Sequence, residues 1–138
     1  MKAVRIVLSL YIAIVFIQSL FFKFTGAPET IHIFGTLGEW SGFDWFAQYG
    51  AIGVGLVELT ASLLLLFGFH LFGALIASGT MAGAVFFHLF TPLGINMPEF
   101  NAEGVIIGDD GGLLFANACA VLLSSLVVLA IALRDRNA

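Results

Sequence analysis

The chain has 138 residues, of which 60% are hydrophobic and only 10% are charged, and its formal net charge is −4. A soluble domain carries roughly 25% charged residues. So few charges cannot cover a water-facing surface, so the composition excludes an ordinary soluble domain and indicates a membrane protein. The length suits a single domain, which we expect to cover residues 1–138.

The first predicted membrane span covers residues 4–22. Lys2 and Arg5 precede this apolar run and could mark a signal peptide, but no small-residue cleavage site ends it. We therefore expect a retained span. Gln18 lies a few residues before its outer end, and Lys23 directly follows it, where a lysine commonly reaches toward the membrane surface.

The first loop, residues 26–49, is too apolar for a plain solvated linker and is rich in tryptophan, tyrosine and phenylalanine. Tryptophan and tyrosine prefer the headgroup zone of a membrane. We expect one or two short helices lying on the interface as a lid over the bundle. Pro28 suits the first turn of such a helix.

The second and third predicted spans cover residues 51–67 and 71–90. Between Glu58 and Glu99 the sequence holds no Asp, Glu, Lys or Arg. Two spans of about 20 residues each fit this stretch. Glu58 lies near the middle of the second span, and His88 lies near the outer end of the third. Gly73, Gly79 and Gly83 belong to a set of small residues for which we expect a helix-packing role.

The second loop, residues 91–110, contains two prolines and scattered glycines, which argue against a long helix. Asp109 and Asp110 come directly before the fourth predicted span, residues 111–133. Carboxylates at that position favour a helix N-terminus, so we expect a capping role for them. Asn117 lies early in the fourth span.

The charges are divided between the ends and the loops of the chain. Basic residues gather at both termini, and all acidic residues except Glu58 and Asp135 lie in the two loops. By the positive-inside rule both termini are cytoplasmic, which requires an even number of spans and places both loops outside. The sequence therefore predicts an all-α, four-transmembrane-helix bundle with an interfacial helical segment, in a bacterial inner membrane.

Several polar side chains fall at a similar depth in the outer third of this bundle when depth is estimated from helical rise. We expect them to line one outward-opening, ligand-binding pocket; they are Gln18, Lys23, Glu58, His88 and Asn117. A carboxylate within a span is by default a functional candidate. The alternative is structural: a protonated Glu58 that hydrogen-bonds Gln18 or Asn117, because burial favours the neutral form.

The chemistry of these groups suits a small set of ligands. A carboxylate and an imidazole near the membrane surface could exchange protons with a quinone head group, and could equally bind a polar lipid or a lipophilic solute. His70 and His88 lie roughly 27 Å apart by helical rise and cannot ligate one haem iron. No flavin, iron–sulfur or metal motif is present, and the single Cys119 argues against disulfide exchange. We therefore expect that the protein binds no haem, flavin or metal.

Segments throughout the chain resemble the DoxX family of small four-helix bacterial inner-membrane proteins. They are FFKFTGAPETIHIF, VELTASLLLLFG, GTMAGAVFFHLFTPLGI and DGGLLFANA. The order Lys23, Glu58, His88 and Asp110-Gly111-Gly112 carries the resemblance. It implies a link to quinone-dependent oxidation of sulfur compounds or to membrane thiol and oxidative-stress complexes. The chain differs from the family pattern at Asn117, where many relatives carry an acidic residue.

The sequence is compatible with three functions. The first is a membrane oxidoreductase subunit that binds a quinone-like or other lipophilic ligand and works with a partner oxidoreductase. The second is a non-enzymatic membrane anchor or assembly partner, and the third is a small-solute transporter. The lipid bilayer is the expected surrounding, a homo-oligomer is left open, and no nucleic-acid partner is expected.

Overall fold

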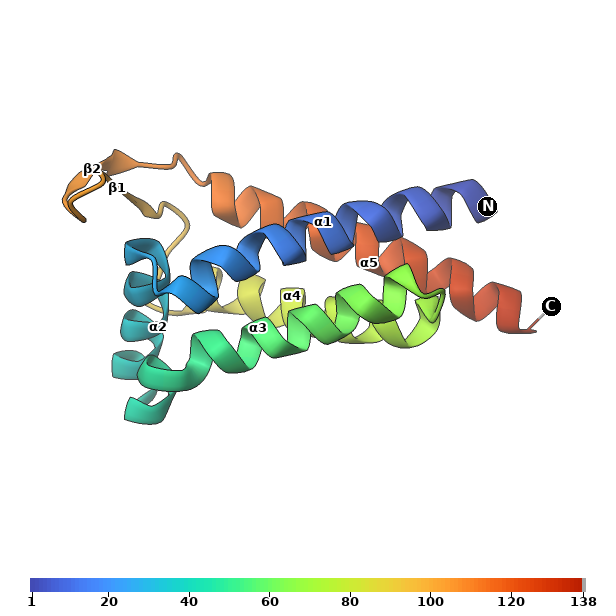
Figure 1. Cartoon of the computed structure of the whole chain (residues 1–138), viewed down its shortest axis with the longest axis horizontal. Helices are drawn as coiled ribbons and strands as arrows, with labels where there is room; N and C mark the ends of the chain where they lie inside the picture. The colour runs from blue at the N-terminus through green and yellow to red at the C-terminus, as the bar shows by residue number, and fades with distance from the viewer. Residues whose placement is uncertain (138) are drawn as a thin grey trace.

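A computed structural model describes residues 1–137 as a bundle of four long helices with one short helix across its end (Figure 1). The long helices are α1 (Lys2–Thr25), α3 (Asp44–Leu66), α4 (His70–Phe90) and α5 (Leu113–Asn137). Each packs against two neighbours, in the ring order α1, α3, α4, α5. The predicted four-helix bundle is confirmed.

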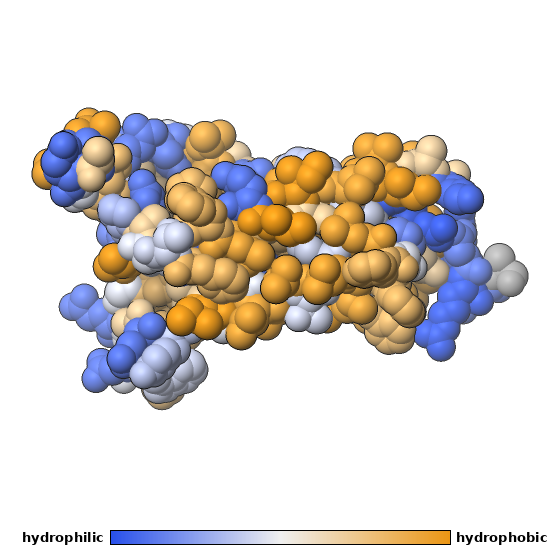
Figure 2. Space-filling view, in the orientation of Figure 1, coloured by the Kyte–Doolittle hydropathy of each residue, from blue (hydrophilic) through white to orange (hydrophobic). Residues whose placement is uncertain are grey.

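All four long helices have the length and composition to cross a membrane. Helices of this length extend over about 30 Å, the thickness of the hydrocarbon core. Figure 2 shows a broad hydrophobic band around the middle of the molecule, with hydrophilic side chains gathered at its two ends. Large apolar side chains such as Ile14, Phe21, Leu75 and Leu123 are exposed. The chain is therefore a multi-pass membrane protein.

The helix α2 (Pro28–Ser41) lies across the end of the bundle opposite to the two termini (Figure 1). Gly26 and Gly42, which end α1 and α2, have φ angles of 67° and 78°. This left-handed conformation costs glycine little, so it allows the chain to turn sharply on both sides of α2. Pro28 occupies the first turn of α2 as predicted. We call this end of the bundle the α2 end, and the opposite one the terminal end.

Two of the helices begin at other residues than the predicted spans. The helix α3 begins at Asp44 rather than at Ala51, so Trp45 and Tyr49 belong to its first two turns and not to a loop. Hydropathy marks only the part of a helix that lies in hydrocarbon, and α3 extends beyond that part. The helix α5 begins at Leu113 rather than at residue 111, because the two preceding glycines adopt positive φ angles.

The loop between α4 and α5 contains no long helix, as predicted, but it folds into a β-hairpin that the sequence did not indicate. The strands β1 (Pro98–Phe100) and β2 (Ile106–Asp109) pair in antiparallel fashion, with Glu99 opposite Gly108. The hairpin contacts α2 through β1, and the rings of His32 and Phe100 lie 6.4 Å apart. Hairpin and short helix together cover the α2 end.

Packing is tight between α3 and α4 near the terminal end. A methyl group added at Gly73 would lie 2.7 Å from Leu65 Cγ and 3.1 Å from the Ala61 carbonyl oxygen. Gly73 therefore has the predicted packing role, because only a hydrogen atom fits there. Gly79 and Gly83 do not: a methyl group at either one would meet no atom within 4 Å. The two helices separate toward the α2 end.

The stability of the bundle should report this difference. We expect Gly73→Ala to lower stability by about 1–3 kcal/mol, the usual cost of overpacking. We expect Gly79→Ala to be neutral or stabilising by up to about 1 kcal/mol, because alanine favours the helix. Thermal unfolding midpoints of the two variants in one detergent check this. Equal losses in both would contradict the assigned packing.

Candidate functional site

The separation of the helices leaves a cavity of about 1480 Å³ in the half of the bundle nearer the α2 end. All five helices and strand β1 contribute to its wall. Ligand pockets commonly measure about 300–1,000 Å³, so this one is large for a chain of 138 residues. Four of the five predicted site residues line it: Gln18, Lys23, Glu58 and Asn117.

An ion pair forms the polar centre of the cavity wall. Lys23 Nζ on α1 lies 3.2 Å from Glu58 Oε2 on α3, and the two side chains are only 17% and 4% exposed. Ser19, one helical turn before Lys23, joins both: Lys23 Nζ donates to Ser19 Oγ at 3.1 Å. The Ser19 hydroxyl lies 2.9 Å from Glu58 Oε2 and 2.8 Å from the Phe16 carbonyl. Its single proton can be donated to only one of them at a time.

Glu58 does not bond Gln18 or Asn117, the partners named in the structural alternative. Its carboxylate bonds Ser19 and Lys23, whereas Asn117 Oδ1 accepts a hydrogen bond from the Tyr11 hydroxyl at 3.3 Å. Asn117 thus links α5 to α1. Gln18 lines the cavity but is exposed. Lys23 bonds inward to a carboxylate instead of simply reaching outward to the membrane surface. A signal for Ser19 was available, because residues four apart share a helix face.

His88 lies outside the cavity wall. It is 6% exposed, and its ring lies 5.6 Å from that of Phe115 on α5. Its Nδ1 is 2.7 Å from the carbonyl oxygen of Gly94. Because a carbonyl oxygen only accepts hydrogen bonds, Nδ1 carries the proton and donates. His88 therefore ties the end of α4 to the loop that follows, and the structure does not bring it to the other four residues.

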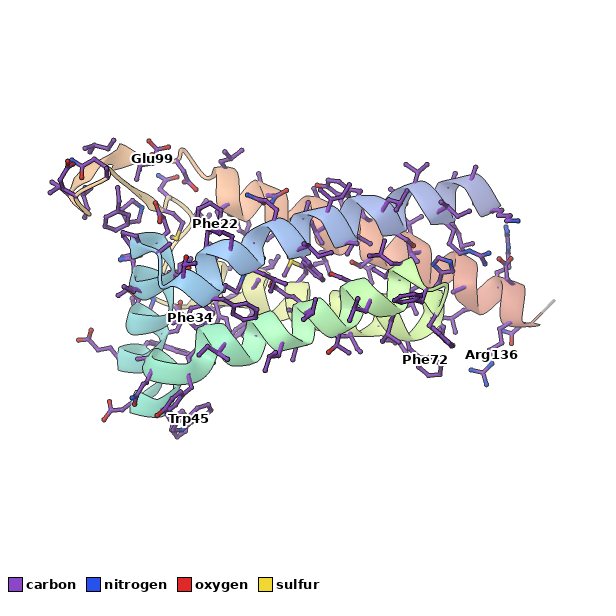
Figure 3. The ribbon with its side chains drawn as sticks, viewed as in Figure 1. Phe22, Phe34, Trp45, Phe72, Glu99 and Arg136 are labelled. Atoms are coloured by element: carbon purple, nitrogen blue, oxygen red, sulfur yellow. The ribbon has the colours of Figure 1, made fainter. Side chains whose placement is uncertain are left out.

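Aromatic rings form the roof of the cavity, as predicted for the first loop. The ring of Phe46 lies 5.6 Å from Phe34 and 6.2 Å from Phe87, so α2, α3 and α4 meet through one cluster. Trp40 on α2 also contacts Phe87. Figure 3 shows Phe22, Phe34 and Trp45 at the α2 end, far from Phe72 and Arg136 at the terminal end. Those three aromatic side chains line the cavity.

The part of the cavity wall near the hairpin is acidic, and we call this part the mouth. Glu29, Glu99 and Asp110 line it, and Glu99 projects at the hairpin in Figure 3. Asp110 caps α5 as expected: its carboxylate accepts hydrogen bonds from the backbone N–H groups of Met97, Gly112 and Leu114. Burial raises the pKa of the Asp110 carboxyl, but these backbone donors lower it by more, so the net shift is downward. Asp110 is therefore ionised at neutral pH.

Searches against protein-family models, curated proteins and solved structures find no match to this chain. Among residues 1–137, no group of three or more His, Cys, Asp or Glu side chains is placed to hold a metal ion. The site is thus defined by its own geometry: a large, mainly apolar cavity with one internal ion pair and an acidic mouth.

Breaking the ion pair should destabilise the bundle. We expect Glu58→Gln and Lys23→Met each to cost about 3–5 kcal/mol, because each leaves one poorly solvated charge without its partner. The double variant should lose clearly less than the sum of the two, because it removes both charges. Unfolding measured for all four proteins in one detergent gives the coupling energy. Additive losses would contradict the ion pair.

Proposed function

We propose that the protein binds a neutral, quinone-like lipophile in this cavity and serves as a membrane subunit of an oxidoreductase system. The observation that carries this proposal is the Lys23–Glu58 pair, held in the wall of a large apolar cavity within a membrane bundle. The resemblance to the DoxX family, some of whose members are associated with quinones, supports it.

The polar groups of the site match a quinone head. An ammonium group has three N–H donors, and Lys23 uses two of them on Glu58 and Ser19. The third can donate to a ligand carbonyl oxygen. Glu58 fixes the position of the ammonium, and Ser19 restrains it further. The aromatic cluster of Phe34, Phe46 and Phe87 would exclude water from the ring of the ligand.

The bound quinone would supply the redox chemistry, which is the transfer of two electrons and two protons. The chain's own residues would bind the ring, orient its oxygens and shield it from water. The electrons would be exchanged with a partner oxidoreductase, which we place at the α2 end. There the hairpin exposes three consecutive apolar residues, Val105, Ile106 and Ile107.

Mass spectrometry of an organic extract of gently purified protein tests the proposal. We expect a quinone or a related neutral lipophile in the wild-type extract and its loss in Glu58→Gln. Gly73→Ala is the matched control, because it should also destabilise the bundle but lies outside the cavity wall. It should retain the ligand.

An extract of wild-type protein without any such lipophile would overturn the proposal. A stable complex with an oxidoreductase that Glu58→Gln leaves intact, together with an empty cavity, would instead support the role of a membrane anchor. Solute flux by the purified protein in liposomes would support a transporter.

We further propose a bacterial inner membrane with both termini in the cytoplasm. Both termini lie at one end of the bundle (Figure 1), and the basic residues of that end are Lys2, Arg5, Arg134 and Arg136. The positive-inside rule places such an end in the cytoplasm. A reporter fused to the C-terminus should behave as cytoplasmic, and one inserted in the turn between β1 and β2 as periplasmic. The reverse pattern would overturn the orientation.

A further inference from the structure

The cavity is open at the side of the bundle, between α3 and α4. Gly53 and Val57 on α3 and Gly79 and Gly83 on α4 line the cavity. Gly53, Val57 and Gly79 are also exposed on the outer surface, and a methyl group added at any of the three glycines would meet no atom within 4 Å. We call this opening, defined by the four residues, the α3–α4 window.

Close contacts limit the window above and below. Toward the terminal end, Gly73 packs directly against Leu65 and closes the seam. Toward the α2 end, the rings of Phe46 and Phe87 lie 6.2 Å apart and bridge the two helices. By helical rise, Gly83 and Gly79 lie roughly 10 Å and 16 Å from the α2 end of α4. The window therefore faces the hydrocarbon layer and not the headgroups.

The opposite seam, between α1 and α5, differs in its chemistry. There the cavity is lined by Gln18 and Asn117 as well as by exposed apolar residues of α5 such as Leu114 and Ala116, and the Tyr11–Asn117 hydrogen bond links the two helices. An amide side chain is costly to leave against an apolar chain without a hydrogen bond. At the α3–α4 window the lining is glycine and valine together with the neighbouring Thr80, whose hydroxyl already donates to the Ile76 carbonyl of its own helix. An apolar ligand chain would therefore lie in the window and not in the α1–α5 seam.

The charges limit the head of the ligand. Lys23 is the only cation among the residues that line the cavity, and Glu58 offsets its charge. Glu29, Glu99 and Asp110 add negative charge at the mouth. An anionic head, such as that of a fatty acid, would be repelled by these carboxylates. The site fits a neutral head, and its volume exceeds what a single ring requires.

We infer that the α3–α4 window is a lateral portal, through which a neutral ring compound with one long apolar chain enters from the bilayer. Its head rests against Lys23 and Glu58, and its chain remains in the window, between the glycine faces of α3 and α4. This inference rests on the proposed function and adds the class of ligand, its route and the residues that select for a chain.

Bulky side chains in the window test the portal. Two quinones that share a ring but carry a short or a long isoprenoid chain are titrated into protein in neutral phosphatidylcholine nanodiscs. Binding is measured by quenching of tryptophan fluorescence, since Trp45 lines the cavity. We expect Gly79→Leu to weaken the long-chain quinone at least about tenfold, or about 1.4 kcal/mol, and the short-chain quinone by less than about twofold.

The controls separate the portal from other effects. Ala82→Leu is the matched control, because Ala82 is exposed on α4 but does not line the cavity, and it should change neither affinity. Gly53→Leu blocks the window from the facing helix and serves if Gly79→Leu does not fold. If Gly79→Leu weakened the binding of both quinones equally, or changed neither affinity, the portal would be overturned but not the proposed function. Failure of wild-type protein to bind either quinone would overturn the proposed function and the portal with it. If a long-chain fatty acid competed with the quinone for binding, the inference that the ligand has a neutral head would be overturned.

Discussion

The ion pair between Lys23 and Glu58 sets the arrangement of α1 and α3 in a medium that solvates neither charge. Hydrocarbon offers no hydrogen bonds, so a charge within the bundle must find its partner inside the protein. The Ser19 hydroxyl forms one further hydrogen bond with the Lys23 ammonium and one with the Glu58 carboxylate. Because a long lysine side chain on α1 must meet a carboxylate on α3, this part of the bundle cannot close into a plain apolar core. The cavity lies beside that pair.

The packing of the helices also differs between the two ends of the bundle. Near the terminal end, Gly73 lets α3 and α4 approach until backbone and side chain touch, and the Arg5–Asp135 pair joins α1 to α5 at 2.7 Å. Near the α2 end, the helices separate and aromatic rings bridge them instead. The tight end can hold the bundle together, so the loose end is free to hold a ligand. Glycine serves opposite purposes at the two ends, contact in one and open space in the other.

Hydropathy alone predicted the number of spans, because the energetic contrast between lipid and water is large and local in sequence. It did not predict that α3 starts at Asp44, since aromatic residues at an interface suit a helix and a loop equally well. Helical rise grouped Glu58 with Gln18 and Asn117, and all three line the cavity, but helical rise estimates only the depth of a residue and not the side of the helix to which it points. The pairing with Lys23 instead of Gln18 or Asn117, and the position of His88 behind the wall, depend on helix rotations that only tertiary packing determines. The hairpin has strands of three and four residues, too short for a clear alternation of side chains.

An apolar cavity of this size that opens into a bilayer would not stay empty, because acyl chains are everywhere around it. Occupation by a chain is therefore expected of any such cavity and does not by itself show specificity. What distinguishes this one is the position of a lysine with a spare N–H donor at its inner wall. A bulk phospholipid would have to place its phosphate in a cavity whose wall already carries the carboxylates of Glu29, Glu99 and Asp110. A neutral ring with one chain would meet no such repulsion. In the proposed function, the charge pair and the glycine window would together favour a compound that has one polar ring and one tail.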